Sequence, residues 1–153
     1  MTSPSSTTDV WHIGSTPLHS RFLLGTAGYP SPDVLRQAIE ASGSQVLTLG
    51  LKRTLAAPGG GDNGFVQIIR DTAQAHGAHL LPNTAGCRSA QEAITLAHMA
   101  RELLGTHWIK LEVVGDEQTL QPDPFELVAA AAQLIRGGFE VLPYCTDDLV
   151  SAR

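Results

Sequence analysis

The sequence predicts an α/β fold in which short parallel strands alternate with amphipathic helices. Five apolar runs recur along the chain, each followed by a turn-rich junction and then by a segment with helical periodicity. The runs are nearly continuous, as expected of strands that are covered on both faces. With 153 residues, of which 42% are hydrophobic, the chain has room for one domain with a sizeable core.

The strands are predicted from runs rich in Leu, Val and Ile. Each run is too short to be a core helix, and strict alternation with helices implies a parallel sheet joined by crossover connections. The predicted strands cover residues 22–26, 45–51, 79–83, 108–114 and 140–144.

The helices carry recognisable start signals. Ser31 before Pro32 combines an N-cap with a proline at the first helical position. The sequence SAQE at residues 89–92 is a capping box, in which serine and glutamate side chains accept hydrogen bonds from free backbone N–H groups. The sequence DPFE at residues 123–126 joins an acidic cap to a proline. These signals predict three helix starts.

Glycines supply the matching stop signals. Gly43, Gly105 and Gly137 stand just past three helical segments, where a left-handed residue ends a helix with little strain. A further helix is predicted over residues 64–75, after a glycine-rich loop at 58–63, and residues 146–153 are expected to begin another.

The repeated units resemble those of a (βα)8 barrel, in which eight units need about 250 residues. This chain offers about five units, so it is either an open doubly wound sheet or the first part of a TIM barrel. We expect the Ser/Thr-rich residues 1–10 to be a flexible tail and residues 11–153 to form the barrel part.

Composition argues against several classes of protein. The chain has 10 Lys+Arg against 15 Asp+Glu, no basic run and few aromatic residues, so no nucleic-acid partner is expected. No apolar run is long enough to cross a bilayer and no secretory signal is visible. Two distant cysteines suit the reduced thiols of a cytoplasmic protein. The six histidines form no ligand motif, so neither metal nor cofactor is expected.

The stretch HWIKLEV, residues 107–113, places a lysine and a glutamate in an otherwise apolar strand. Alternation puts Lys110 and Glu112 on one face, which in a barrel would be the axis, and the aliphatic residues on the face toward the helices. A lysine covered there can attack a carbonyl and form an imine, with the carboxylate moving protons. A self-neutralising structural ion pair explains the spacing equally well.

Polar residues also follow the ends of other strands. Asn83 and Thr84 end the third strand and Tyr144 ends the fifth, so all three are candidate substrate-binding residues, although packing of the strand ends is the simpler explanation. Lys52 and Arg53 end the second strand with two positive charges, which could bind an anionic group or form solvated salt bridges. We expect Cys145 to be an inert apolar residue.

The chain resembles the thiazole synthase of the bacterial thiamin pathway. The resemblance runs from about Trp11 to the last residue, nearly without gaps outside the glycine-rich stretch. It rests on the blocks TLGLKR at 48–53, LLPNTAG at 80–86, WIKLEV at 108–113, QPDP at 121–124 and VLPYCTDD at 141–148.

The resemblance implies a TIM barrel, usually homo-oligomeric, and a specific reaction. The family condenses deoxyxylulose phosphate, dehydroglycine and sulfur from a thiocarboxylated ubiquitin-like sulfur carrier protein into a thiazole carboxylate phosphate. By resemblance, Lys110 forms the Schiff base with the sugar ketone and Glu112 shuttles protons during the rearrangement. Alternatives are an aldolase-type barrel that uses the same lysine on another keto-sugar phosphate, and an inactive split-gene fragment that only binds a partner.

Two departures from the family pattern bear on activity. The family's GTGKY near the first strand reads GTAGY here, at residues 25–29, so its lysine is absent. The family's phosphate-binding loops and a further acidic residue would lie beyond residue 153. We therefore expect this polypeptide alone to be inactive in thiazole formation and poorly soluble, or to pair with another half.

Overall fold

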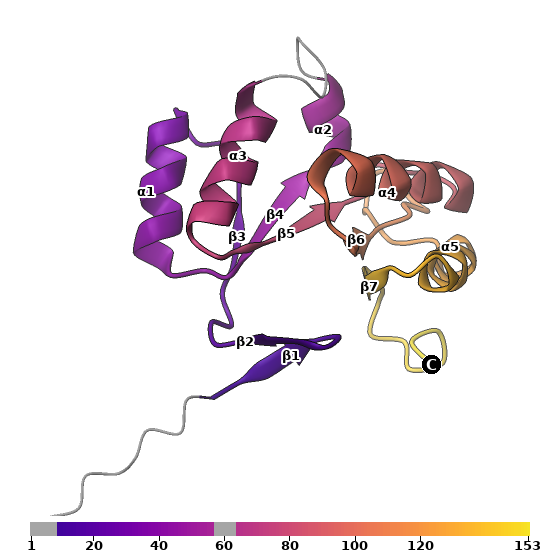
Figure 1. Ribbon diagram of the computed structural model, residues 1–153. Helices are drawn as coiled ribbons and strands as arrows, with labels where there is room; N and C mark the ends of the chain where they lie inside the picture. Colours follow the sequence, from indigo (N-terminus) through magenta and orange to yellow (C-terminus); the bar gives the residue numbers. More distant parts are fainter. Residues whose placement is uncertain (1–8, 57–63) are drawn as a thin grey trace, which may run out of the picture.

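The computed structural model describes residues 9–56 and 64–153. Its centre is a five-stranded parallel sheet in which the strands follow one another in chain order (Figure 1). All five strands were predicted, and each observed strand lies within its predicted range. The strands are β3 (Leu23–Gly25), β4 (Val46–Gly50), β5 (His79–Asn83), β6 (Trp108–Leu111) and β7 (Glu140–Pro143).

Helices connect successive strands and gather on one side of the sheet (Figure 1). One helix lies between each pair of neighbouring strands, except that two follow β4. Within the described parts of the chain, no helix has the length and apolar character needed to cross a membrane. The helices are α1 (Pro32–Ser42), α2 (Leu51–Ala56), α3 (Gly64–Ala75), α4 (Ala90–Leu104) and α5 (Pro124–Arg136).

The predicted helix starts are confirmed by their hydrogen bonds. The Ser31 hydroxyl accepts from the third backbone N–H after it, and Ser89 does the same at the start of α4. The Asp123 carboxylate accepts from the N–H groups of the second and third residues after it, both at 3.0 Å. The glutamate of the capping box, Glu92, reaches back one residue farther than the cap and accepts from the Arg88 N–H at 2.9 Å.

The predicted helix ends are partly confirmed. Gly43 and Gly105 are left-handed, with φ of 59° and 66°. For α5 the prediction is wrong by one residue, because Gly137 has a φ of −79° and still donates to the helix, while Gly138 is left-handed at 80°. The helix predicted over residues 146–153 is also wrong, since that segment forms only a turn closed by the Asp148 side chain.

Two boundaries around the strands differ from the prediction. β6 ends at Leu111, so residues 112–114 leave the ladder, and Val114 instead bridges to Pro122 within the following loop. Leu51, predicted as the last residue of a strand, begins α2, a helix that was not predicted. The predicted glycine-rich loop at 58–63 lies outside the described residues.

A short antiparallel hairpin, not predicted from the sequence, closes the amino-terminal end of the sheet (Figure 1). It consists of β1 (Trp11–Ile13) and β2 (Thr16–Leu18). Gly14 makes its turn with a φ of 55°, and a Cβ atom there would collide with the carboxylate of Glu140 at the start of β7. The left-handed backbone therefore favours glycine, and any side chain at this position would also require the Glu140 carboxylate to move.

The hairpin and the helices cover opposite faces of the sheet, and each face has its own core. The larger core joins the helices to the outer face, including Ile109 and Leu111 of β6. The smaller core contains Trp108 together with Ile13 and Leu18 of the hairpin. The alternation predicted for β6 is thus confirmed, and it directs Lys110 away from the helices.

Candidate functional site

One row of residues crosses the inner face of the sheet near its carboxyl edge. Gly50 pairs with Asn83 in the register of β4 and β5, Asn83 pairs with Lys110 of β6, and Lys110 pairs with Leu142 of β7. Neighbouring strands lie about 4.8 Å apart, so the Lys110 amine stands between an amide side chain and an aliphatic one. Substrates of barrel proteins bind at this edge of the sheet.

Lys110 and Glu112 form an ion pair at this edge. The Lys110 Nζ lies 3.2 Å from Glu112 Oε1, and the side chains keep 43% and 14% of their exposure. The Lys110 side chain is therefore more exposed than expected for a strand covered on both faces. Among the described residues, the hairpin core on the inner face of β6 includes Trp108 and does not extend to Lys110. The Tyr144 ring centroid lies 6.0 Å from the same ammonium, within the range of a cation–π contact.

Thr84 is fully buried and holds the backbone of Glu112 in place. Its hydroxyl accepts from the Glu112 N–H at 2.7 Å and donates to the Glu112 carbonyl at 2.8 Å. Its own N–H donates to the Lys110 carbonyl at 3.2 Å. The Thr84 hydroxyl therefore both donates to and accepts from the Glu112 backbone.

The loop after β6 forms a small hollow beside Glu112. The hollow has a volume of about 240 Å³, and Glu112, Tyr144 and Leu120 contribute to its lining. The Tyr144 hydroxyl donates to the Leu120 carbonyl at 3.3 Å, and Leu120 is the one non-glycine residue with a positive φ in the described parts of the chain. Tyr144 therefore links the end of β7 to the loop that borders the ion pair.

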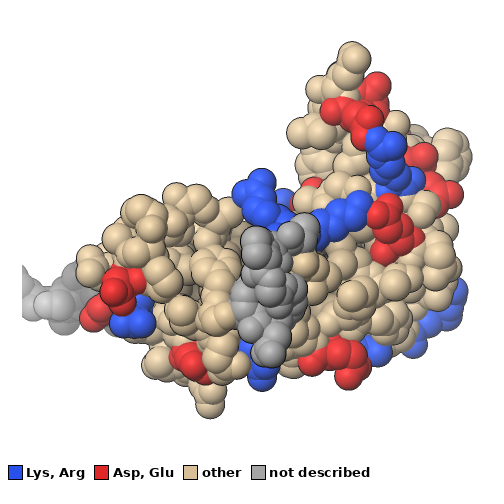
Figure 2. Space-filling model, turned by 90° about the horizontal axis from the view of Figure 1, so that it is seen from above, with Lys and Arg blue, Asp and Glu red and all other residues tan. Residues whose placement is uncertain are grey.

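A second hollow of about 370 Å³ opens at the ends of β3, β4 and β5. Lys52 lines it but is engaged, because its Nζ donates to the Gly86 carbonyl at 2.6 Å and pairs with Glu92. The hydrogen bond from Lys52 to the Glu92 carboxylate lowers the pKa of that carboxyl. Arg53 lines the same hollow, is exposed, and forms no ion pair within the described residues. Seen from above, Lys and Arg side chains gather near the centre of the molecule (Figure 2).

The two cysteines lie in contrasting environments. Cys87 is fully buried beneath the Lys52–Glu92 pair, and burial followed by the nearby Glu92 charge raises the pKa of its thiol to about 11. Cys145 is exposed, and its expected inertness stays a prediction. Neither thiol has a histidine partner in the described parts of the chain.

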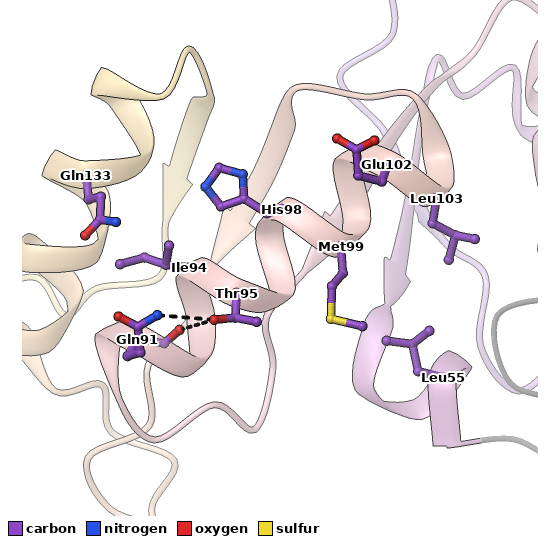
Figure 3. A pocket seen from close by; sticks show the side chains of 9 residues that line it. All are labelled: Leu55, Gln91, Ile94, Thr95, His98, Met99, Glu102, Leu103 and Gln133. Carbon is purple, nitrogen blue, oxygen red and sulfur yellow. Dashed lines mark hydrogen bonds between the residues drawn. The ribbon is translucent and has the colours of Figure 1, made fainter.

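A third hollow, larger than the two at the sheet edge, lies on the outer side of the helix layer. It has a volume of about 840 Å³ and spreads over α4 between α2 and α5 (Figure 3). Met99, 48% exposed, and Leu55 form part of its apolar lining. Lys110 and Glu112 do not line it, so this hollow and the ion pair of the sheet are separate.

The sequence did not predict two ion pairs that lie beside the carboxyl edge of the sheet. Arg88 and Glu117 form an ion pair that borders the small hollow, and Lys52 joins α2 to α4 through Glu92. These partners are far apart in the sequence and no local spacing connects them. Within residues 9–56 and 64–153, no three potential metal-ligating side chains come together.

Curated relatives of this chain are thiazole synthases. The sequence is 52% identical over 141 residues to the thiazole synthase of Coxiella burnetii, which covers 92% of this chain and 52% of the relative. It is 58% identical over 134 residues to that of Variovorax paradoxus, covering 86% and 48%. The chain thus spans about half the length of the curated relatives it matches.

Solved structures place the fold. The complex of BexX and CysO from Amycolatopsis orientalis matches 93% of this chain and 56% of the other, with a TM-score of 0.71 and 26% identity. A phospho-2-dehydro-3-deoxyheptonate aldolase from Thermotoga maritima matches 89% and 45%, with a TM-score of 0.51; at 13% identity it speaks for the fold alone. The predicted TIM-barrel class is confirmed.

A family model matches most of the chain. The model, described as thiazole biosynthesis protein ThiG, matches residues 12–153, which include all of the hairpin except its first residue, all five parallel strands and both hollows at the sheet edge. This chain therefore belongs to the ThiG family of thiazole biosynthesis proteins.

Proposed function

We propose that this chain carries the imine-forming centre of a thiazole synthase, with Lys110 as the nucleophile. The observation that supports this most directly is the position of the Lys110 amine. It lies on the inner face at the carboxyl edge of the sheet, 3.2 Å from the Glu112 carboxylate. An amine open to substrate and beside a carboxylate is what imine formation requires.

The chemistry starts with proton removal from the ammonium. Glu112 is the base within reach, and the free amine then attacks the ketone carbon of deoxyxylulose phosphate. Glu112 gives this proton to the departing hydroxyl, water leaves, and a protonated imine forms between Nζ and that carbon. The Glu112 carboxylate then takes a proton from the neighbouring carbon, giving an enamine. Glu112 returns that proton to the former ketone carbon and takes the hydroxyl proton of the neighbouring carbon, so the carbonyl moves one carbon along the sugar.

Neighbouring side chains orient the substrate in this proposal. The Asn83 Oδ1 already accepts from the Ala85 N–H at 3.2 Å, which leaves its amide N–H groups to donate to a sugar hydroxyl. The Tyr144 ring stabilises the Lys110 cation before proton loss and the iminium after it. We do not assign substrate contact to Thr84, since its hydroxyl is committed to Glu112.

Two further reactants follow from the family. Dehydroglycine would supply nitrogen and two carbons, and a thiocarboxylated carrier protein would supply sulfur. A two-protein complex among the structural neighbours is compatible with docking of such a carrier at the sheet edge. An aldolase-type reaction on another keto-sugar phosphate is the competing proposal, and it would need no sulfur.

Borohydride trapping tests the imine directly, because the chain has only two lysines, Lys52 and Lys110. The protein is incubated with deoxyxylulose phosphate, reduced, digested and mapped by mass spectrometry. We expect the sugar phosphate adduct on the peptide with Lys110, and a loss of at least about a thousandfold in adduct formation in Lys110→Ala. Lys52→Gln is the matched control and should keep the adduct.

An adduct that persists in Lys110→Ala, or that maps to Lys52, would contradict the assignment. Consumption of the thiocarboxylated carrier, followed by intact mass in a complete family member, separates the two reactions. An adduct on the lysine without loss of thiocarboxylate would favour the aldolase-type reaction.

A further inference from the structure

We propose that the hollow at the ends of β3, β4 and β5 binds the carboxylate of a small planar α-imino acid, with Arg53 as its ligand. This inference rests on the proposed function, since it assigns a place to the second carbon substrate of the same site. The hollow has a volume of about 370 Å³, near the lower limit of about 300 Å³ for small-molecule sites, so it suits a small acid rather than a protein segment.

The lining of this hollow favours an anion. Its polar groups are two cations, one amide and two hydroxyls, and no Asp or Glu takes part. The Lys52 charge is already balanced by Glu92. Arg53 has neither an ion pair nor a side-chain hydrogen bond among the described residues, so its guanidinium is the charge left for a ligand.

The balance of charge favours a carboxylate over a phosphate. One guanidinium can bind two oxygens of a planar carboxylate with two parallel hydrogen bonds. The Asn83 amide, in the same lining, can donate to an adjacent atom of the ligand. A phosphate carries a charge of about −1.5 to −2, whereas Arg53 is the one cation of this lining without an ion pair among the described residues, so a singly charged acid matches it better.

The hollow lies near Lys110, where the imine is proposed to form. Asn83 lines the hollow and pairs with Lys110 in the strand register, so Lys110 lies on the strand next to one that borders the hollow, and these two strands are about 4.8 Å apart. Gly25 and Gly50 also line it and lie on the inner face in register with Thr48 and Asn83. Without side chains at these two positions, an acid seated on Arg53 has access to a sugar held on Lys110.

Oxamate is a suitable probe, because it is a planar two-carbon acid that forms no imine. Its dissociation constant is measured by NMR titration of ¹⁵N-labelled protein, in parallel with inorganic phosphate. We expect oxamate to perturb residues that line the hollow, and Arg53→Gln to weaken its binding roughly 10- to 100-fold. Arg53→Lys should restore only part of the affinity, since a lysine lacks the paired donors.

Arg136→Gln is the matched control, an exposed arginine at the end of α5, and should leave oxamate binding unchanged. Lys110→Ala should also leave it unchanged, so failure of the imine and failure of this hollow give different results. Tighter binding of phosphate than of oxamate, or equal oxamate affinity in Arg53→Gln and the unchanged protein, would overturn the proposal.

Discussion

The two ends of the parallel sheet are built from the same strands and serve different purposes. At the amino end the inner face is closed, with Trp108, 2% exposed, packed under the β1–β2 hairpin and stacked on His79 at 4.7 Å. At the carboxyl end the inner face is open, and Lys110, two residues farther along β6, keeps 43% of its side-chain exposure.

In the proposed function, this one strand carries both stability and chemistry. Trp108 packs under the hairpin at the amino end, and the Lys110–Glu112 pair lies at the exposed carboxyl end. The amino end should therefore respond to substitution through folding, and the carboxyl end through reactivity. Each of the following experiments can break or sharpen that division.

Trp108→Ala should have the largest effect on folding. Removing a buried aromatic ring from the smaller core should lower the free energy of unfolding by about 3–5 kcal/mol. Lys110→Ala, on the same face of the same strand, should change it by less than about 0.5 kcal/mol. Urea unfolding followed by circular dichroism measures both, with exposed His12→Ala as a control within the hairpin. Equal destabilisation at positions 108 and 110 would abolish the division between the two ends.

The cysteines should differ next most strongly. With a thiol pKa of about 11, Cys87 has only about one thiolate in a thousand molecules at pH 8, and it is fully buried as well. Cys145 is exposed and should react with iodoacetamide at least about 100-fold faster. Peptide mapping over time measures the two rates. Rapid native labelling of Cys87 would show that the layer behind the carboxyl edge opens readily.

Thr84→Val should have a moderate effect on both folding stability and the reactivity of Lys110. The valine cannot bond to the Glu112 backbone, and an unsatisfied N–H there should cost about 1–2 kcal/mol of folding stability. It should also slow adduct formation at Lys110 while leaving the amine in place. Exposed Thr95→Val is the control for the loss of a hydroxyl. A variant with unchanged stability and trapping rate would remove Thr84 from its positioning role.

Glu92→Gln should have the smallest effect. The native state lowers the pKa of this carboxyl, so its stabilising contribution is present above the unfolded-state pKa and is lost as the pH falls through the native value. At pH 7 the substitution should lower the free energy of unfolding by less than about 1 kcal/mol, because the pair is exposed.

The difference between Glu92→Gln and the unchanged protein should shrink as the pH falls below the ordinary glutamate pKa of about 4.3, and should vanish below the lowered native pKa. Glu102→Gln, at an exposed glutamate on the same helix, is the matched control. A Glu92 effect that persists unchanged at low pH would assign its role to packing instead of charge.

The sequence predicted the regular parts of the fold well, because local chemistry determines them. Three helix starts, two of the three glycine ends and all five parallel strands follow from caps, glycines and apolar runs. The hairpin escaped prediction because its strands are three residues long, too short to show a period, and one contains Pro17. α2 escaped because it follows β4 directly: Gly50, the residue before it, is also the last residue of the strand, and no Ser, Thr, Asp or Asn cap marks its start.

The candidate site was predicted in part. Alternation along β6 sufficed to place Lys110 and Glu112 on one face, since a period of two is a local property. The exposure of the Lys110 side chain could not be predicted, because a run of apolar residues does not show how far other elements pack along each face of the strand. The roles of Thr84 and Arg53 depend on contacts between distant strands and helices, which appear only when the register is known.

The turn at Gly14 restricts what substitutions the amino end can accept. A side chain there meets two separate obstacles, the left-handed backbone and the Glu140 carboxylate. Shortening Glu140 would remove the second obstacle and leave the first. A saturation library at position 14 should therefore favour glycine, and asparagine and aspartate, which tolerate a left-handed backbone best among the other residues, should gain when position 140 is randomised with it.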